Sequence, residues 1–154
     1  MLPEPPEPSA VSDAHNQSFM VRLFRLWAMA RETGENPVTW LYRTASRHGY
    51  PDETANACAS LFELVEGHLG RKLIRERCCN RIYSSDEKAL LGVVRAAPSL
   101  SPPYANITIP HGLPGAIYWA AMAVRRALSI TGIATATARK CPFGPSMQGG
   151  AAAA

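Results

Sequence analysis

The chain of 154 residues lacks the motifs that most often mark a catalytic site. It has no Gly-x-Ser-x-Gly, no His-Glu-x-x-His, no glycine-rich phosphate-binding loop and no paired catalytic carboxylates. His111 lies in Pro-His-Gly-Leu-Pro-Gly, which is similar to the oxyanion loop of some hydrolases, but no nucleophile motif accompanies it. A turn that enters a helix accounts for this stretch, so the sequence does not indicate an enzyme or a small-molecule substrate.

A secretory leader and an uninterrupted apolar span are also missing. The N-terminus has neither the basic start nor the apolar run of a signal peptide, so we expect a cytoplasmic protein with reduced thiols. The most apolar stretch, 115–138, carries Arg125 and Arg126 near its centre, where each would cost about 2.5 kcal/mol or more in a bilayer. We therefore predict a buried helix there and no membrane span.

Acidic residues are absent after Glu87. The first 13 residues carry three acids and no base, so their net charge is −3. Because the whole chain has a net charge of +4, residues 14–154 have a net charge of +7. A basic body attracts phosphates, anionic lipids or acidic protein surfaces without choosing among them.

The periodicity of apolar residues predicts a mainly α fold, a compact bundle of about five helices. The predicted helices cover 17–32, 37–47, 52–69, 84–97 and 113–131. We expect one domain over 15–135, between flexible tails at 1–14 and 136–154. In the first helix, Arg22 and Arg25 are expected on the side opposite the apolar stripe.

Three local signals support these helix ends. Asn36-Pro37 is typical of a helix start, and Gly70 is typical of a helix end. Ser84 and Glu87 have the spacing of a capping box. Residues 73–78 and the β-branched 106–109 suggest a minor two-stranded element.

The adjacent thiols Cys78 and Cys79 admit two interpretations. Neighbouring arginines favour the thiolate that redox chemistry or a metal ion requires, and a zinc site would add Cys58 and His68 as the nearest candidate ligands. These four residues lack the spacing of a known zinc motif, and free cysteine behaves as a small hydrophobe. We therefore expect no cofactor and a pair of thiols buried at the joint between two helices.

The densest positive stretch is a second candidate site. It consists of Arg71, Lys72, Arg75, Arg77 and Arg81. Such a cluster can bind phosphates, or it can form a solvated face whose cations pair with Glu63, Glu66 and Glu76.

The stretch 78–87, followed by Ala-Leu-Leu at 89–91, resembles a family of short bacterial proteins of unknown function. The shared pattern is Cys-Cys-x-Arg, then Asp-Glu, then Leu-Leu, and the likeness extends more loosely over 17–96. Asn80 replaces a proline of that pattern, and one extra residue separates Arg81 from Asp86. The resemblance implies a compact helical domain and carries no activity.

Three functions follow, in order of preference. The first is a non-catalytic interaction or regulatory protein that binds another macromolecule, most simply a protein, through a basic helical surface. The second is a nucleic-acid-binding protein that uses the 71–81 cluster. The third is a thiol or metal protein centred on Cys78 and Cys79.

Overall fold

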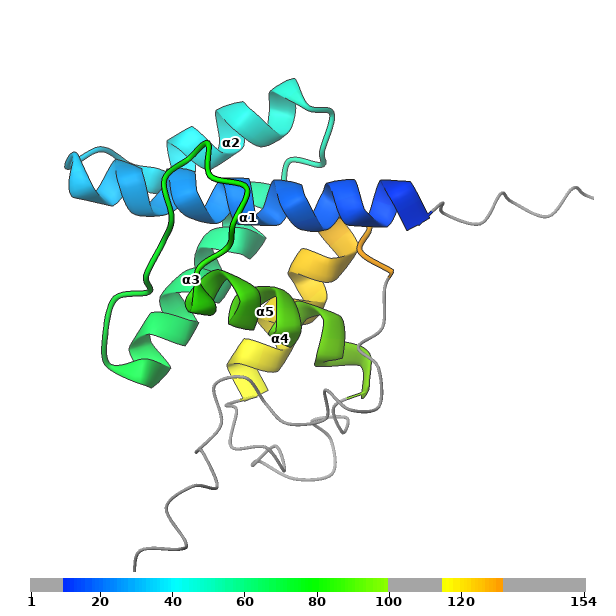
Figure 1. Cartoon of the computed structure of the whole chain (residues 1–154). Coiled ribbons are helices and arrows are strands. Elements are labelled where there is room, and N and C mark those ends of the chain that lie inside the picture. The colour runs from blue at the N-terminus through cyan, green and yellow to red at the C-terminus, as the bar shows by residue number, and fades with distance from the viewer. Residues whose placement is uncertain (1–9, 100–114, 132–154) are drawn as a thin grey trace, which may run out of the picture.

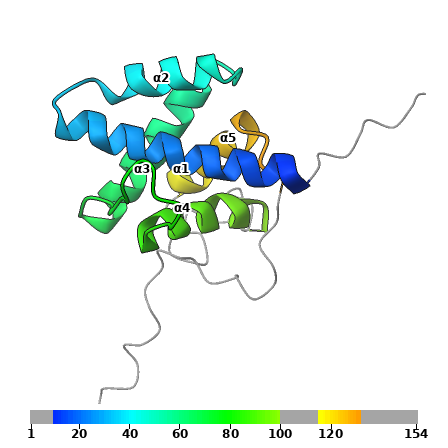
Figure 2. The same cartoon turned by 45° about the horizontal axis from the view of Figure 1, so that its top comes forward.

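The computed structural model describes residues 10–99 and 115–131, and within them five α-helices form one bundle (Figures 1 and 2). The predicted mainly α fold class is confirmed. The helices are α1 (Ala10–Glu32), α2 (Pro37–Arg47), α3 (Thr54–Leu69), α4 (Ser85–Ala96) and α5 (Gly115–Ala127), with a 3-10 turn η1 (Ala97–Ser99) after α4. None of these helices is long and apolar enough to cross a bilayer.

Helix α1 runs through the middle of the arrangement. Figure 1 shows α2 on one side of it and α3 and α4 on the other, and α1 contacts all three. Its side chains Phe24 and Trp27 are fully buried and pack on Phe62 of α3, with ring centroids 5.2 and 5.4 Å apart. Helix α5 packs on α3 and on α4. Because α1 is covered by several elements, little of its middle faces water.

The predicted local signals for α2 and α3 are confirmed. The Asn36 side chain accepts hydrogen bonds from the backbone N–H groups of Val38 and Thr39. Gly70 ends α3 in the left-handed conformation, with φ of 67°, which glycine adopts without the steric cost of a Cβ atom.

The start of α1 was predicted wrongly. The helix begins at Ala10 and not at residue 17, so residues 10–14 do not belong to a flexible tail. Two contacts with the segment after α5 hold this first part: Asn16 donates to the Ser129 carbonyl, and Asp13 accepts from the Thr131 N–H. These contacts join residues more than 100 positions apart, so local periodicity could not reveal them.

The segment between α3 and α4, residues 71–84, does not form the predicted β element. It contains no strand, and neither does any other part of the chain that the structure describes. Its backbone groups are satisfied by side chains instead of a ladder: the Ile74 N–H donates to Asp86 and the Glu76 N–H donates to Glu87. The proposed partner strand at 106–109, and His111, lie outside the described residues.

The start of α4 is the capping box that the sequence predicts. Ser84 Oγ accepts from the Glu87 N–H at 3.1 Å, and Glu87 Oε2 accepts from the Ser84 N–H at 3.0 Å. The Ser84 hydroxyl also donates to the Ile74 carbonyl at 2.6 Å, which ties the preceding segment to the helix.

We expect Ser84→Ala to lower the free energy of unfolding by about 1–2 kcal/mol, because it removes the cap and leaves the Ile74 carbonyl without this donor. Urea denaturation followed by circular dichroism measures the change. Ser85→Ala is the matched control, since Ser85 is exposed, and its effect should stay within about 0.5 kcal/mol. Equal effects of the two substitutions would contradict the role of the cap.

Candidate functional site

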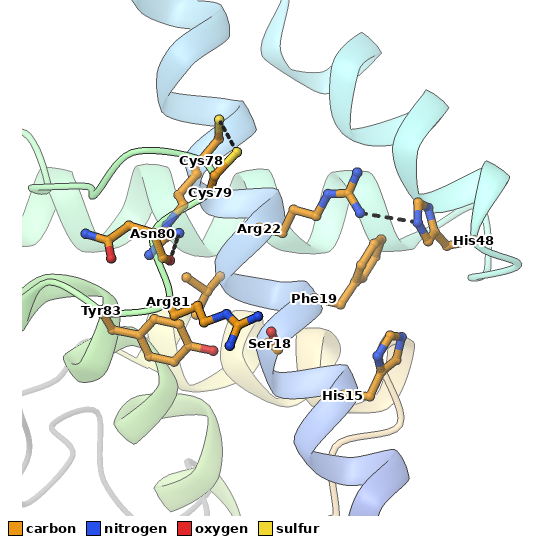
Figure 3. Close-up of a pocket in the computed structure, with 12 residues that line it drawn as sticks. His15, Ser18, Phe19, Arg22, His48, Cys78, Cys79, Asn80, Arg81 and Tyr83 are labelled. Carbon is orange, nitrogen blue, oxygen red and sulfur yellow. Dashed lines mark hydrogen bonds between the residues drawn. The ribbon is translucent and has the colours of Figure 1, made fainter.

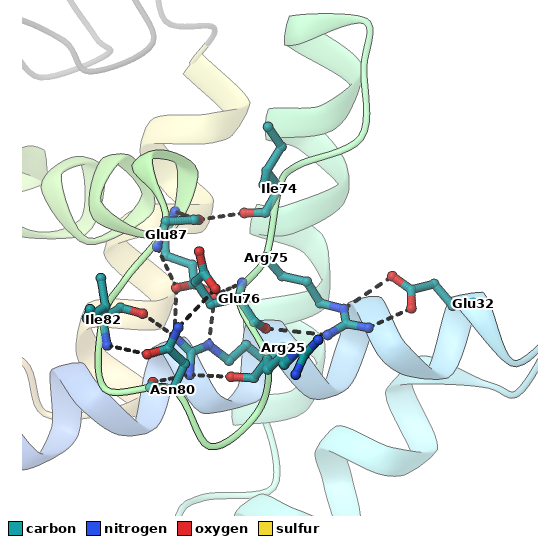
Figure 4. A network of polar contacts seen from close by, with 10 residues as sticks. Arg25, Glu32, Ile74, Arg75, Glu76, Asn80, Ile82 and Glu87 are labelled. Carbon is teal, nitrogen blue, oxygen red and sulfur yellow. Dashed lines mark hydrogen bonds and ion pairs between the residues drawn. The ribbon is translucent and has the colours of Figure 1, made fainter.

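Arg25 lies inside the protein, which corrects its predicted place on the outer face of the first helix. Its side chain is 4% exposed and forms an ion pair with Glu87 of α4 (Figure 4). Arg25 Nε donates to Glu87 Oε1 at 2.7 Å, and Nη2 donates to Oε2 at 2.8 Å. This two-pronged geometry matches the planar guanidinium to the planar carboxylate.

The remaining donors of Arg25 hold the backbone of residues 77–82. Nη1 donates to the carbonyls of Arg77 at 3.0 Å and Asn80 at 2.7 Å, and Nη2 donates to that of Ile82 at 3.1 Å. A guanidinium has five N–H donors, and all five are used here. A lysine, with three donors on a single nitrogen, could not make this set of contacts.

Glu87 is satisfied to the same degree. Besides Arg25, it accepts the N–H groups of Glu76 and Ser84, both at 3.0 Å. Burial alone would raise the pKa of Glu87, but the bonds from Arg25 and the two N–H groups outweigh it, so the pKa lies below its usual value. The carboxylate is therefore held in its charged form inside the bundle.

Asp86, beside it, anchors the start of the same segment. It accepts from Arg71 Nη1 at 2.7 Å and Nη2 at 2.9 Å, and from the Ile74 N–H at 2.7 Å. The Arg71 contact, followed by the Ile74 bond, lowers the pKa of Asp86 against the effect of burial. The Arg71 side chain is thus already paired with a carboxylate of the protein itself.

The five cations of the predicted binding cluster consequently divide into two groups. Arg71 pairs with Asp86, and Arg75 pairs with Glu32 at 2.6 Å. Lys72, Arg77 and Arg81 are exposed, and the side chains of Arg77 and Arg81 form no ion pair with the described part of the chain. The expected pairing with Glu63, Glu66 and Glu76 is wrong: Glu66 pairs with Arg31, and Glu76 accepts from the side chain of Asn80.

Cys78 and Cys79 are exposed, so their predicted burial is wrong. They form the corner of a turn that is closed by a bond from the Asn80 N–H to the Arg77 carbonyl at 2.9 Å. Their sulfur atoms are 3.6 Å apart. The turn reaches the surface because Arg25 holds its two ends by their carbonyls and leaves its corner outside.

The four candidate metal or redox residues are not brought together. Cys58 is buried in α3, where burial raises the pKa of its thiol to about 12, whereas His68 is exposed on the last turn of that helix. Within residues 10–99 and 115–131, no three His, Cys, Asp or Glu side chains are placed to share a metal ion.

The exposed thiols instead line a pocket of about 360 Å³ between α1, the end of α2 and the turn (Figure 3). Apart from Arg25, which is paired with Glu87, four of the lining side chains are basic: His15, Arg22, His48 and Arg81. None of the described residues that line it is Asp or Glu. We call this site the cationic pocket.

One wall of the cationic pocket is aromatic. The Phe19 ring stacks on Tyr50 at 4.4 Å and packs against the His48 ring at 4.9 Å. His48 Nδ1 lies 2.8 Å from the Thr44 carbonyl, and its Nε2 lies 3.4 Å from Arg22 Nη1. These two contacts fix the orientation of the His48 ring against Phe19.

Sequence reasoning missed this pocket because its residues come from three distant segments. His15 and Arg22 lie about two helical turns apart on α1, and this spacing is the only local signal in the sequence, since His48 and Arg81 lie in distant segments. The exposure of the cysteine turn depends on Arg25, whose partner Glu87 is 62 residues away.

No protein-family model, no curated protein and no solved structure matches this chain. The resemblance to short bacterial proteins therefore stays a prediction.

We expect Arg25→Ala to lower the free energy of unfolding by about 3–5 kcal/mol, because it leaves the charge of Glu87 buried without a counter-ion. Arg75→Ala is the matched control: it also breaks an ion pair, but Glu32 is exposed, so the loss should be about 1 kcal/mol or less. Chemical denaturation at neutral pH measures both. A small loss for Arg25→Ala would show that the buried pair does not organise the fold.

The lowered pKa of Glu87 also predicts how stability depends on pH. A carboxylate with a lowered folded-state pKa stabilises the fold above its unfolded-state value of about 4.3, and this contribution disappears as the pH falls through the folded-state value. We therefore expect Glu87→Gln to be less stable than the parent at neutral pH, and the difference to shrink below about pH 4. Glu63→Gln, on the exposed face of α3, is the control. A difference that stayed constant with pH would contradict the assignment.

Proposed function

We propose that this is a non-catalytic interaction protein whose cationic pocket binds an acidic segment of a partner protein. The observation that carries the proposal is the lining of the pocket. Arg22, Arg81 and two histidines line it, and no carboxylate from the described residues is part of the lining.

The charge of the pocket is available for a ligand because the nearby carboxylates are already occupied. Glu87 is saturated by Arg25 and two N–H groups, and Asp86 is held by Arg71. Arg81 therefore presents a free guanidinium, and this group binds carboxylates through two parallel hydrogen bonds. A pocket of about 360 Å³ has room for one or two acidic side chains.

Apolar surface beside the charge favours a protein partner. Ile82, which follows Arg81 in the sequence, is 69% exposed. Protein interfaces combine apolar and aromatic contacts with arginine in this way. An acidic segment that also carries apolar side chains would contact both kinds of surface.

Nucleic acid is the second candidate, and the division of the 71–81 cluster weakens it. Phosphate binding draws its affinity from many cations at once, whereas Arg71 and Arg75 are held by Asp86 and Glu32. Lys72, Arg77 and Arg81 are the cations of the cluster that are exposed and outside such a pair, and three are few for such a contact.

Binding of a short fluorescent peptide of alternating glutamate and leucine, followed by anisotropy, tests the proposal. We expect Arg81→Glu and Arg22→Glu each to weaken binding by roughly tenfold or more, as the loss of a charge-assisted hydrogen bond implies. Arg43→Glu is the matched control, since Arg43 is exposed on α2 outside the pocket and the net charge changes equally.

Two outcomes would overturn the proposal. If Arg43→Glu weakens binding as much as Arg81→Glu, the peptide is held by net charge and not by the pocket. If single-stranded DNA binds far more tightly than the peptide, with an affinity that falls steeply with salt, the nucleic-acid candidate takes its place.

A further inference from the structure

The corner of the cysteine turn brings two exposed thiols together at the edge of the cationic pocket. The Cys78 and Cys79 sulfur atoms lie 3.6 Å apart, close enough for one thiol to donate to the other (Figure 3). Because Arg25 fixes the carbonyls of Arg77 and Asn80 on either side, the fold itself sets the conformation of the pair. The proximity of the two sulfur atoms is therefore a consequence of the fold around them.

We propose that Cys78 and Cys79 form a reversible oxidation site, at which a hydroperoxide converts the two thiols into a disulfide between adjacent residues. Three observations support it: the proximity of the sulfurs, their exposure, and the cations around them. The chemistry of this site does not depend on the proposed function of the pocket.

Arg22 and Arg81 line the same pocket as the two thiols. In general, positive charge beside a cysteine stabilises its thiolate, the form that attacks a peroxide. The hydrogen bond to Cys78 raises the pKa of Cys79, while the charge of Arg25 opposes this rise. We take Cys78 as the attacking group and Cys79 as the resolving one, an order that the single variants described below test.

The reaction balances with one hydroperoxide per pair. The Cys78 thiolate attacks one peroxide oxygen, the O–O bond breaks, and Cys78 becomes a sulfenic acid while the other oxygen leaves as hydroxide or alkoxide and takes up a proton. The Cys79 sulfur then attacks the Cys78 sulfur, the S–O bond breaks, and the oxygen leaves as water with the proton of Cys79. Two electrons pass from the two thiols to the peroxide.

Strain makes this disulfide easy to reverse. Adjacent Cα atoms lie about 3.8 Å apart, below the range of about 4.4–6.8 Å that disulfides favour. A strained, exposed disulfide has a high reduction potential and is readily reduced by cellular thiols. The bond is therefore suited to a switch and not to structural support.

Peroxide treatment of the folded full-length chain tests the proposal. Cleavage after Glu76 and Glu87 isolates a fragment, residues 77–87, with both thiols and no other cysteine. We expect the mass of this fragment to fall by two hydrogen atoms on oxidation and to recover on treatment with dithiothreitol. The oxidation should be several-fold faster in the folded chain than in a synthetic peptide of residues 77–87. The fragment with buried Cys58 should stay reduced.

Single variants separate the two roles. Cys79→Ser should leave a sulfenic acid on Cys78 that dimedone traps, whereas Cys78→Ser should react more slowly with peroxide. Both turn positions are exposed, so both variants should fold, and circular dichroism verifies this.

Three results would overturn the site. The first is a fragment that stays reduced while Cys58 is modified. The second is oxidation that joins only separate molecules. The third is a rate equal to that of the synthetic peptide, which would show that the fold contributes nothing. The binding assay with the glutamate–leucine peptide tests the proposed function alone. A failure of the peptide to bind would therefore not contradict the oxidation of Cys78 and Cys79.

Discussion

The buried contact between Arg25 and Glu87 joins three parts of the chain: α1, the start of α4 and the irregular segment between α3 and α4. Taking two charges out of water costs several kcal/mol per ion, and the mutual attraction repays this only when further hydrogen bonds complete both groups. Here every guanidinium donor and both carboxylate oxygens are used. The pair therefore tolerates burial, and in return it fixes a segment that has no secondary structure of its own.

This arrangement separates the cations that build the fold from those that face solvent. Arg25, Arg71 and Arg75 each bind a carboxylate and a backbone carbonyl, and so act as structural links. Arg22 and Arg81 are exposed at the pocket that the linked segment encloses. Net charge alone could not have distinguished the two groups, since all five are arginines on or near the same loop. The partner of each arginine decides what it is free to do.

Local chemistry made much of the fold predictable, and distant contacts made the site unpredictable. The ends of α2, α3 and α4 follow from Asn36, Gly70 and the Ser84–Glu87 box, each of which acts within one helical turn. Periodicity predicted the wrong environment for Arg25 because it assumes a helix with one solvent-exposed face. Helix α1 instead contacts α2, α3 and α4, and Arg25 also contacts residues 77–82. The same failure led to the wrong burial of the cysteines, since the position of their turn depends on Arg25.

The dependence of the turn on Arg25 also bears on how the thiols behave. The carbonyls that Arg25 binds belong to Arg77 and Asn80, the residues directly before and after the two cysteines. Any bond between the sulfurs must be accommodated between these two fixed points, because moving either one breaks a hydrogen bond to a buried cation. The network that brings the thiols together thus also resists a change in their backbone. A segment held in this way returns to its starting conformation once the bond between the sulfurs is reduced.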